Sequence, residues 1–235
     1  MSEALDKVRG VRELPLFPLP LVLFPGAPLP LHIFEERYRR LLADVRASNN
    51  LFGLSYFAPD AADSARRPPE GHAGCATEVV EAQSLPDGRS NILTIGVVRY
   101  RVEEYVERGD PYLVARVEFF EDDAEDAAAV ARRAAEVNEL FMRIARAMRA
   151  ASDERGALPE LPVEDPERLS FLVAAVVEME AESKQRLLET RSTSERLRRL
   201  YTMLAEAVSA YESRARTHEV SRSNGHAGKK VEPGE

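Results

Sequence analysis

His72 and Cys75 lie three residues apart and have the most reactive side chains in the chain. A histidine beside a cysteine can activate a thiol nucleophile or supply two ligands to a metal ion. A metal site needs three or four ligands, and the only other histidine before the C-terminal tail is His32. Cys75 follows Gly74 and precedes a β-branched run. We therefore expect a small buried thiol at the start of a strand, and no metal or other cofactor.

Carboxylates form a second group of candidates, because two of them at a suitable distance can perform acid–base catalysis. They are Glu35, Glu36, Asp44, Glu78 and Glu81. Glu35 and Glu36 are adjacent on a predicted helix and therefore point in different directions, and no pattern places a partner near either of them. We expect these carboxylates to form a solvated face, and we expect no catalytic residue.

Arginines suggest a third kind of chemistry, which is the binding of phosphates. They fall in one predicted helix and one predicted hairpin: Arg37, Arg39, Arg40, Arg46, Arg99 and Arg101. The formal net charge of the whole chain is −8, which disfavours a nucleic-acid partner because phosphates attract basic surfaces. RNA binding through a local basic strip stays open as an alternative function.

Aromatic residues are concentrated in the first half of the chain, where 12 of the 16 Phe and Tyr residues lie between positions 17 and 120. We expect most of them to be core, but alternating strands also place some residues on the outer face. An exposed apolar groove beside a strand edge can hold an extended peptide. The predicted peptide-binding candidates are His32, Phe34, Tyr56, Tyr100 and Tyr105.

The elements that position these residues begin with an uncharged stretch over 14–34, which is long enough to cross a bilayer as a helix. Six prolines interrupt it, and each costs about 3 kcal/mol in a helix interior. We therefore predict short buried strands over 14–19, 21–24 and 29–34, and no spanning or targeting segment. Because one cysteine allows no internal disulfide, the chain suits a reducing cytoplasm.

The next elements predict a β-rich domain over 12–120 with one inserted helix. Apolar side chains at helical spacing predict that helix within 34–48. Strands are predicted over 51–57 and 112–120, and a surface loop over 58–74. The Pro86-Asp87-Gly88 turn between two strand-like runs indicates a hairpin.

At Glu121 the composition changes to a helical pattern. A long helix is predicted from the apolar stripe Val130, Ala134, Val137, Phe141, Ile144 and Met148. Asp165 followed by Pro166 is typical of a helix start. We predict a helical bundle over 121–215 and, because apolar residues are few beyond it, a disordered tail over 216–235.

Two stretches carry a resemblance to a known family. The opening of the Lon protease N-terminal domain is similar to residues 13–42, "ELPLFPLPLVLFPGAPLPLHIFEERYRRLL". The central hairpin of that domain is similar to residues 74–102, "GCATEVVEAQSLPDGRSNILTIGVVRYRV". The later helices follow in a similar order, so the resemblance covers about residues 12–212. It implies an α+β fold, with an N-terminal PUA-like β pseudo-barrel containing one inserted helix, followed by a C-terminal helical bundle.

The catalytic motifs of that protease are missing from this sequence. The only Gly-Lys pair, Gly228-Lys229, lacks the other residues of a Walker A loop. The Lon protease site uses a Ser–Lys dyad, and Lys184 is the one lysine outside the probable tails. We expect its acidic neighbours to keep Lys184 charged. We therefore expect no ATPase and no peptidase, and a free-standing domain that carries a peptidase S16 or Lon-like family name.

The resemblance implies binding of unfolded or extended polypeptide segments, in an adaptor or substrate-recognition role for an ATP-dependent protease. Affinity in the micromolar range is expected, because a few contacts must offset the ordering of a flexible peptide. We expect no membrane partner, and a monomer or weak dimer. Two alternatives stay open: an RNA-binding PUA-like module, and an interaction protein that acts through its helical bundle.

Overall fold

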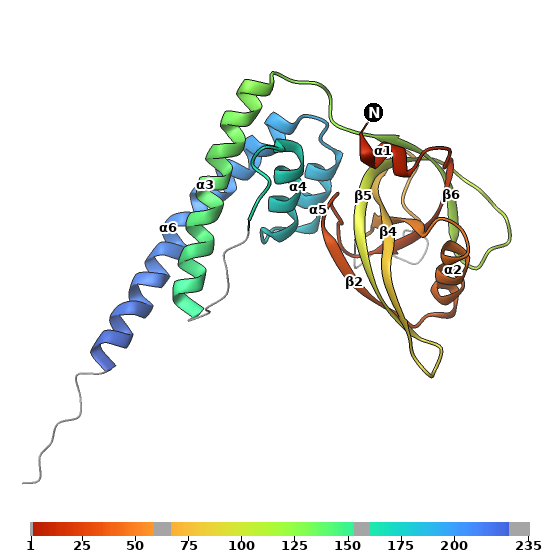
Figure 1. Ribbon diagram of the computed structural model, residues 1–235, viewed down its shortest axis with the longest axis horizontal. Helices are drawn as coiled ribbons and strands as arrows, with labels where there is room; N and C mark the ends of the chain where they lie inside the picture. The colour runs from red at the N-terminus through yellow and green to blue at the C-terminus, as the bar shows by residue number, and fades with distance from the viewer. Residues whose placement is uncertain (1, 59–66, 153–159, 226–235) are drawn as a thin grey trace, which may run out of the picture. The chain divides into compact units, whose positions relative to one another are not determined.

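The computed structural model describes residues 2–58, 67–152 and 160–225 (Figure 1). Contacts between residues divide the chain into two compact units. The barrel unit comprises Met1–Ala124 and Phe171–Ser192, and the helical unit comprises Glu125–Ser170 and Thr193–Glu235.

Five strands of the barrel unit close into a ring. They are β1 (Glu13–Leu19), β3 (Leu51–Tyr56), β4 (Ala73–Ser84), β5 (Ser90–Tyr105) and β6 (Leu113–Phe120). Strand β1 pairs with β3 and β6, β4 lies between β3 and β5, and β5 pairs with β6 to complete the ring. Only the β1–β3 pair of these is parallel. This mixed sheet confirms the predicted β pseudo-barrel.

Alternation along the strands fills the barrel with apolar side chains. In β5 the even-numbered residues from Ser90 to Val98 are buried, and the odd-numbered ones are not. Tyr100 completes this interior and is 0% exposed. A Cβ atom at Gly53 or Gly74 would lie 2.7 or 2.5 Å from the Tyr100 side chain. Glycine is therefore required at both positions for the large ring to fit.

Helix α2 (Glu36–Arg46) is the inserted helix, and it packs its apolar face on the barrel (Figure 1). Its buried residues are Tyr38, Leu41, Leu42 and Val45, which pack with Phe17 and Phe52. The spacing of these four residues is the helical spacing that predicted the element.

The uncharged stretch over 14–34 differs from the prediction in one place, because residues 21–24 form no strand. After them, Gly26 has φ 77° and donates its N–H to the Gly96 carbonyl at 2.8 Å. Gly96 in turn donates to the Ala27 carbonyl at 3.0 Å. This glycine bulge aligns β2 (Pro28–Ile33) with β5, so the residues before it serve as an irregular connection. No helix in the described part of the chain is long and apolar enough to span a membrane.

The segment Phe171–Ser192 groups with the barrel unit, whereas the predicted bundle over 121–215 placed it with the other helices. It contains the end of α4 (Pro166–Val176) and all of α5 (Ala181–Glu189). The short helix α1 (Glu3–Lys7), which was not predicted, also belongs to this unit.

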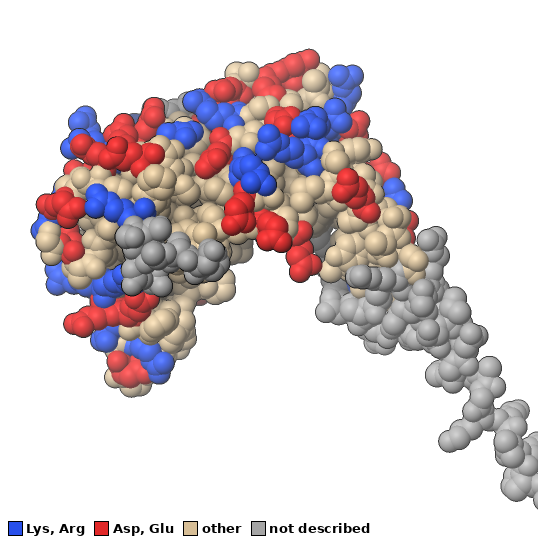
Figure 2. All heavy atoms as spheres, turned by 180° about the vertical axis from the view of Figure 1, so that it is seen from behind, with Lys and Arg blue, Asp and Glu red and all other residues tan. Residues whose placement is uncertain are grey.

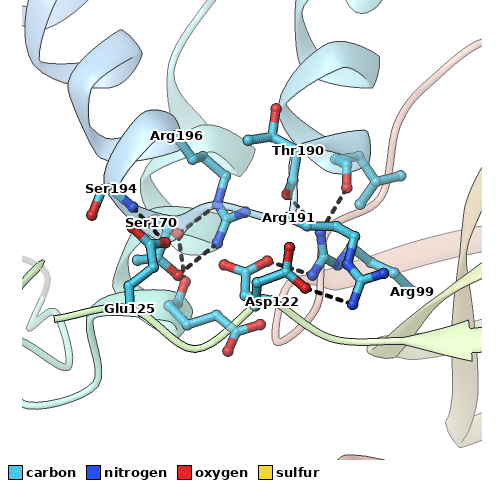
Figure 3. A network of polar contacts seen from close by, with 12 residues as sticks. Arg99, Asp122, Glu125, Ser170, Thr190, Arg191, Ser194 and Arg196 are labelled. Atoms are coloured by element: carbon cyan, nitrogen blue, oxygen red, sulfur yellow. Dashed lines mark hydrogen bonds and ion pairs between the residues drawn. The ribbon is translucent and has the colours of Figure 1, made fainter. Parts of the chain in front are cut away.

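Arg99 connects the barrel to this segment. The side chain is 1% exposed and pairs with Asp122 (Figure 3). It also donates to the carbonyl oxygens of Leu188 and Thr190 at 3.0 and 2.8 Å. The Phe171 ring lies 5.0 Å from the guanidinium carbon. A buried cation with this many acceptors is satisfied, and it fixes the segment after α5 to β5.

The helical unit is built on α3 (Ala127–Ser152) and α6 (Thr193–Gly225), which pack along each other. The buried side chains of α3 are Val130, Ala134, Val137, Leu140, Ile144 and Ala147. Four residues of the predicted stripe are therefore buried, but Met148 is 51% exposed. The 3.6-residue period carries the stripe through Leu140 and Ala147 instead of Phe141 and Met148.

Two further contacts order the ends of these helices. Arg196 is 0% exposed and donates to the Ser170 hydroxyl at 2.7 Å, and the Ser194 N–H donates to the Glu125 carboxylate at 3.2 Å (Figure 3). Helix α6 continues to Gly225, ten residues past the predicted end of the bundle at 215. The rest of the predicted disordered tail, 226–235, lies outside the described residues.

Candidate functional site

A groove of about 690 Å³ lies within the barrel unit and is its candidate binding site. Three parts of the chain line it: residues 16–20 at the end of β1, residues 35–38 at the start of α2, and residues 105–114 between β5 and β6. Phe57 and Arg67 complete the lining. Its volume is in the range of pockets that hold small molecules or a few peptide side chains.

Tyrosine rings form the apolar part of the groove. Tyr38 stacks on Phe17 with ring centroids 3.9 Å apart. Tyr105 donates to the Pro68 carbonyl at 2.6 Å, and Tyr112 donates to the Asp44 carboxylate at 2.8 Å. These bonds fix the rings, so the groove is formed before any ligand binds.

Arginines line the groove between the rings, and each has a carboxylate partner. Arg37 pairs with Glu35 at 2.7 Å, Arg67 pairs with Glu107 at 3.4 Å, and Arg108 pairs with Glu13. All three pairs are substantially exposed, so they contribute little to stability. Their effect is to cancel positive charge that would otherwise attract phosphates.

Two tyrosines of the groove, Tyr105 and Tyr112, stay neutral at physiological pH. Burial raises the pKa of Tyr105 to about 12, despite the opposing charge of Arg67. Burial, followed by the hydrogen bond to Asp44, also raises the pKa of Tyr112. Both hydroxyls therefore act as hydrogen-bond donors and not as bases. The lining suits binding by contact and hydrogen bonding better than a reaction.

The five predicted peptide-binding candidates lie in different places, and only Tyr105 lines the groove. Tyr100 is inside the barrel, where its hydroxyl lies 2.6 Å from the Ser55 hydroxyl. Tyr56 is buried and donates to Glu182 at 2.7 Å.

His32 and Phe34, the remaining two candidates, form an exposed pair that is not part of the groove lining. Their ring centroids are 6.1 Å apart, and Phe34 is 61% exposed. His32 makes a 2.7 Å hydrogen bond with the Asn91 side chain. The five candidates therefore do not form one site, because only Tyr105 lines the groove and only His32 and Phe34 form an exposed pair.

Sequence reasoning missed the contribution of residues 106–114 to the groove. The pattern of the run "RGDPY" before β6 predicts only a turn, whereas the structure places Arg108, Asp110 and Tyr112 of this run in the lining. The available signal was an aromatic residue and both charge signs within one short turn. Such a turn can reach across the end of a barrel to β1, which the sequence does not reveal.

The free edge of the sheet is a poor site for adding a peptide strand. Among the described strands, β2 alone has a single neighbour. The Ala27 carbonyl accepts from the Gly96 N–H, so the backbone groups of every second residue after Ala27 point toward β5. The backbone groups of the residues between them, Pro28, Pro30 and His32, point outward. Proline has no N–H, so two of these three outward positions cannot donate. This pattern protects the edge from pairing with another chain.

Cys75 and His72 do not form a reactive pair. Cys75 is 0% exposed in β4, as predicted, and burial raises its pKa to about 12. The thiol is therefore protonated and inert at neutral pH. Burial lowers the pKa of His72. No group of three or more His, Cys, Asp and Glu residues suited to a metal occurs in the part of the chain that the structure describes.

Lys184 is partly buried, and this burial lowers its pKa. Its amino group donates to the Ala175 carbonyl at 2.8 Å. The adjacent Ser183 hydroxyl accepts instead from Arg186, also at 2.8 Å. Lys184 thus stabilises the turn from α4 into α5 and has a structural role.

One arginine of the predicted basic strip, Arg99, is buried in the structure and so cannot contribute to a basic surface. Arg99 is buried with Asp122, while Arg40 pairs with Asp44 at 2.9 Å on the surface. On the face shown in Figure 2, basic and acidic side chains are interspersed. This distribution gives no support to a continuous phosphate-binding surface.

A closed barrel of mixed strands with a groove lined by tyrosines and paired arginines defines an α+β domain. Consistent with this class, the family described as the ATP-dependent protease La (LON) substrate-binding domain matches residues 13–206. The chain belongs to this family.

Curated relatives include the Lon proteases of Brevibacillus choshinensis and Syntrophus aciditrophicus. The first is 26% identical over 196 residues, which are 83% of this chain and 25% of the relative. The second is 28% identical over 193 residues, which are 80% of this chain and 24% of the relative. The chain therefore spans about a quarter of the length of these relatives.

Two solved structures have the same fold. A Lon N-terminal domain protein from Xanthomonas campestris aligns with a TM-score of 0.60 and 22% identity, over 82% of this chain and 98% of that one. The N-terminal domain of the Mycobacterium avium complex Lon protease aligns with a TM-score of 0.63 and 17% identity, over 83% and 98%.

Proposed function

We propose that the chain is a non-catalytic module that binds unfolded or extended polypeptide segments, and that it binds them in the groove of the barrel unit. The observation that carries the proposal is the groove itself, which presents fixed tyrosine rings and arginines paired with carboxylates in a substrate-binding family. Apolar rings with few directional partners tolerate many peptide sequences, as recognition of unfolded chains requires.

Membership of the family supports a role in ATP-dependent proteolysis, in which this domain selects polypeptides for a protease. The chain itself has no chemical step to perform in this role. The buried, protonated thiol of Cys75 and the occupied amino group of Lys184 support this non-catalytic assignment. We place the protein in the cytoplasm, because its one cysteine is buried and reduced.

Fluorescence anisotropy with a labelled, permanently unfolded polypeptide tests the proposal on the 235-residue chain. We expect saturable binding in the micromolar range. Tyr105→Ala should weaken it about ten-fold, because it removes an aromatic ring and frees Arg67 from its position 3.9 Å over that ring. Circular dichroism of the variant establishes that the fold is kept.

Phe34→Ala is the matched control, because it removes an exposed aromatic ring that is not part of the groove lining. It should leave the affinity unchanged. If Phe34→Ala weakens binding and Tyr105→Ala does not, peptides bind at the His32–Phe34 surface instead. If no saturable signal appears below about 1 mM, the peptide-binding function is wrong.

The same titration at low and high salt addresses the RNA alternative. A complex with RNA weakens steeply as salt rises, because phosphate binding releases counterions. A complex in the groove should change little, since its arginines are already paired with carboxylates.

A further inference from the structure

The charges around the groove are balanced except at Asp110. Each lining arginine has a carboxylate partner, as described above. Asp110 also lines the groove, is exposed, and has no ion pair or hydrogen bond within the described ranges of the chain. The groove therefore presents one uncompensated negative charge to a ligand.

Tyr112, two residues after Asp110, is also different from the other tyrosines of the groove. An arginine lies over the ring of Tyr38 at 4.6 Å and over the ring of Tyr105 at 3.9 Å. No cation lies over the Tyr112 ring among the residues that the structure describes. A tyrosine face near a carboxylate attracts a cation through both charge and ring quadrupole.

The electrostatic environment of Tyr112 also favours a cation near its ring. Burial is the main cause that raises the pKa of its hydroxyl, and the nearby carboxylates of Asp44 and Asp110 raise it further. The carboxylate of Asp44 is already engaged, because it accepts from Tyr112 and from Arg40. Of these two carboxylates, Asp110 is therefore the one that can accept a hydrogen bond from a ligand.

We propose that the groove contains a subsite for a basic side chain, at Asp110 and Tyr112, so that it selects extended segments with a Lys or Arg flanked by apolar residues. The basic group pairs with the Asp110 carboxylate and lies over the Tyr112 ring. The chain shows the same arrangement internally, where Arg67 lies over Tyr105 and pairs with Glu107. The inference rests on the proposed function and specifies the peptide class for that site.

Three fluorescein-labelled ten-residue peptides test the subsite. They share one apolar sequence and differ only at the central residue, which is Arg, Gln or Glu. We expect the Arg peptide to bind about three- to ten-fold more tightly than the Gln peptide, and the Glu peptide to bind most weakly. Asp110→Asn should remove the preference, and Asp110→Lys should reverse it in favour of the Glu peptide.

Glu118→Lys is the matched control, because Glu118 is exposed on β6, outside the groove lining. It changes the net charge of the chain as much as Asp110→Lys does, and it should leave the order of the three peptides unchanged. If Glu118→Lys alters the order as strongly, the preference is a long-range charge effect and the subsite is wrong.

The remaining outcomes separate the subsite from the proposed function. If all three peptides bind equally and Tyr105→Ala weakens each of them, the peptide groove stands and the basic subsite is wrong. If none of them binds saturably, both the groove function and the subsite are wrong. A preference for Arg that survives Asp110→Lys also contradicts the subsite.

Discussion

At the scale of single residues, the buried Arg99–Asp122 pair should contribute measurably to stability. Both side chains are almost completely buried, at 1% and 4% exposure. Asp122→Ala leaves the guanidinium buried without its carboxylate, and we expect a loss of about 3 kcal/mol in the free energy of unfolding, near the lower end for a broken buried pair. The loss is at this end because the carbonyls of Leu188 and Thr190 still accept from Arg99.

Denaturant unfolding of the barrel unit in the whole chain measures this effect. The double variant Arg99→Met with Asp122→Ala should recover part of the lost stability, since no unpaired charge remains. Glu104→Ala, which breaks the exposed pair with Arg116, is the control and should cost less than about 1 kcal/mol. Equal losses in the buried and exposed variants would contradict this role of Arg99.

His72 gives the barrel unit a pH dependence, because burial lowers its pKa below the ordinary value of 6.5. The unfolded chain then binds a proton more readily than the folded chain. The free energy of unfolding is therefore not reduced by His72 above about pH 6.5. It decreases as the pH falls below this value, with a slope of at most about 1.4 kcal/mol per pH unit.

Denaturant unfolding between pH 7.5 and 5 measures that slope in variants. These pH values lie on either side of the ordinary histidine pKa of about 6.5. His72→Asn should give a flatter profile than the wild type, whereas His32→Asn, which changes an exposed histidine, should keep the wild-type profile. If His72→Asn and the wild type lose stability in parallel, other groups cause the acid sensitivity.

At the scale of elements, the prolines of β2 decide how the sheet edge behaves. Pro28→Thr with Pro30→Thr adds two outward N–H groups to the free edge of β2. We expect the double variant to associate at concentrations where the wild type does not, because edge strands with free donors and acceptors pair with one another. Sedimentation velocity over a concentration series measures the average mass.

The control for this change is Pro86→Thr, which removes an exposed proline from the β4–β5 turn and not from a strand. Its average mass should match that of the wild type. A double β2 variant that sediments like the wild type at all concentrations would show that the prolines do not protect this edge.

At the scale of the whole molecule, the family and the fold were accessible from the sequence, and the division into units was not. The proline-rich opening and the central hairpin resemble the Lon protease N-terminal domain, and the family match over 13–206 confirms that resemblance. The grouping of Phe171–Ser192 with the barrel involves contacts such as those of Arg99, which lies about 90 residues earlier in the chain than Leu188 and Thr190. A contact over that separation leaves no local pattern.

The sequence by itself determined most of the elements, because periodicity, prolines and caps are local properties of the chain. Alternation in β5, the helical spacing in α2 and the buried thiol of Cys75 all follow from near neighbours. Only the tertiary structure decided the groove, because it is formed where the β5–β6 connection meets the end of β1 and the start of α2. Ring closure brings these segments together through long-range hydrogen bonds, and composition does not specify which side chains then face one another.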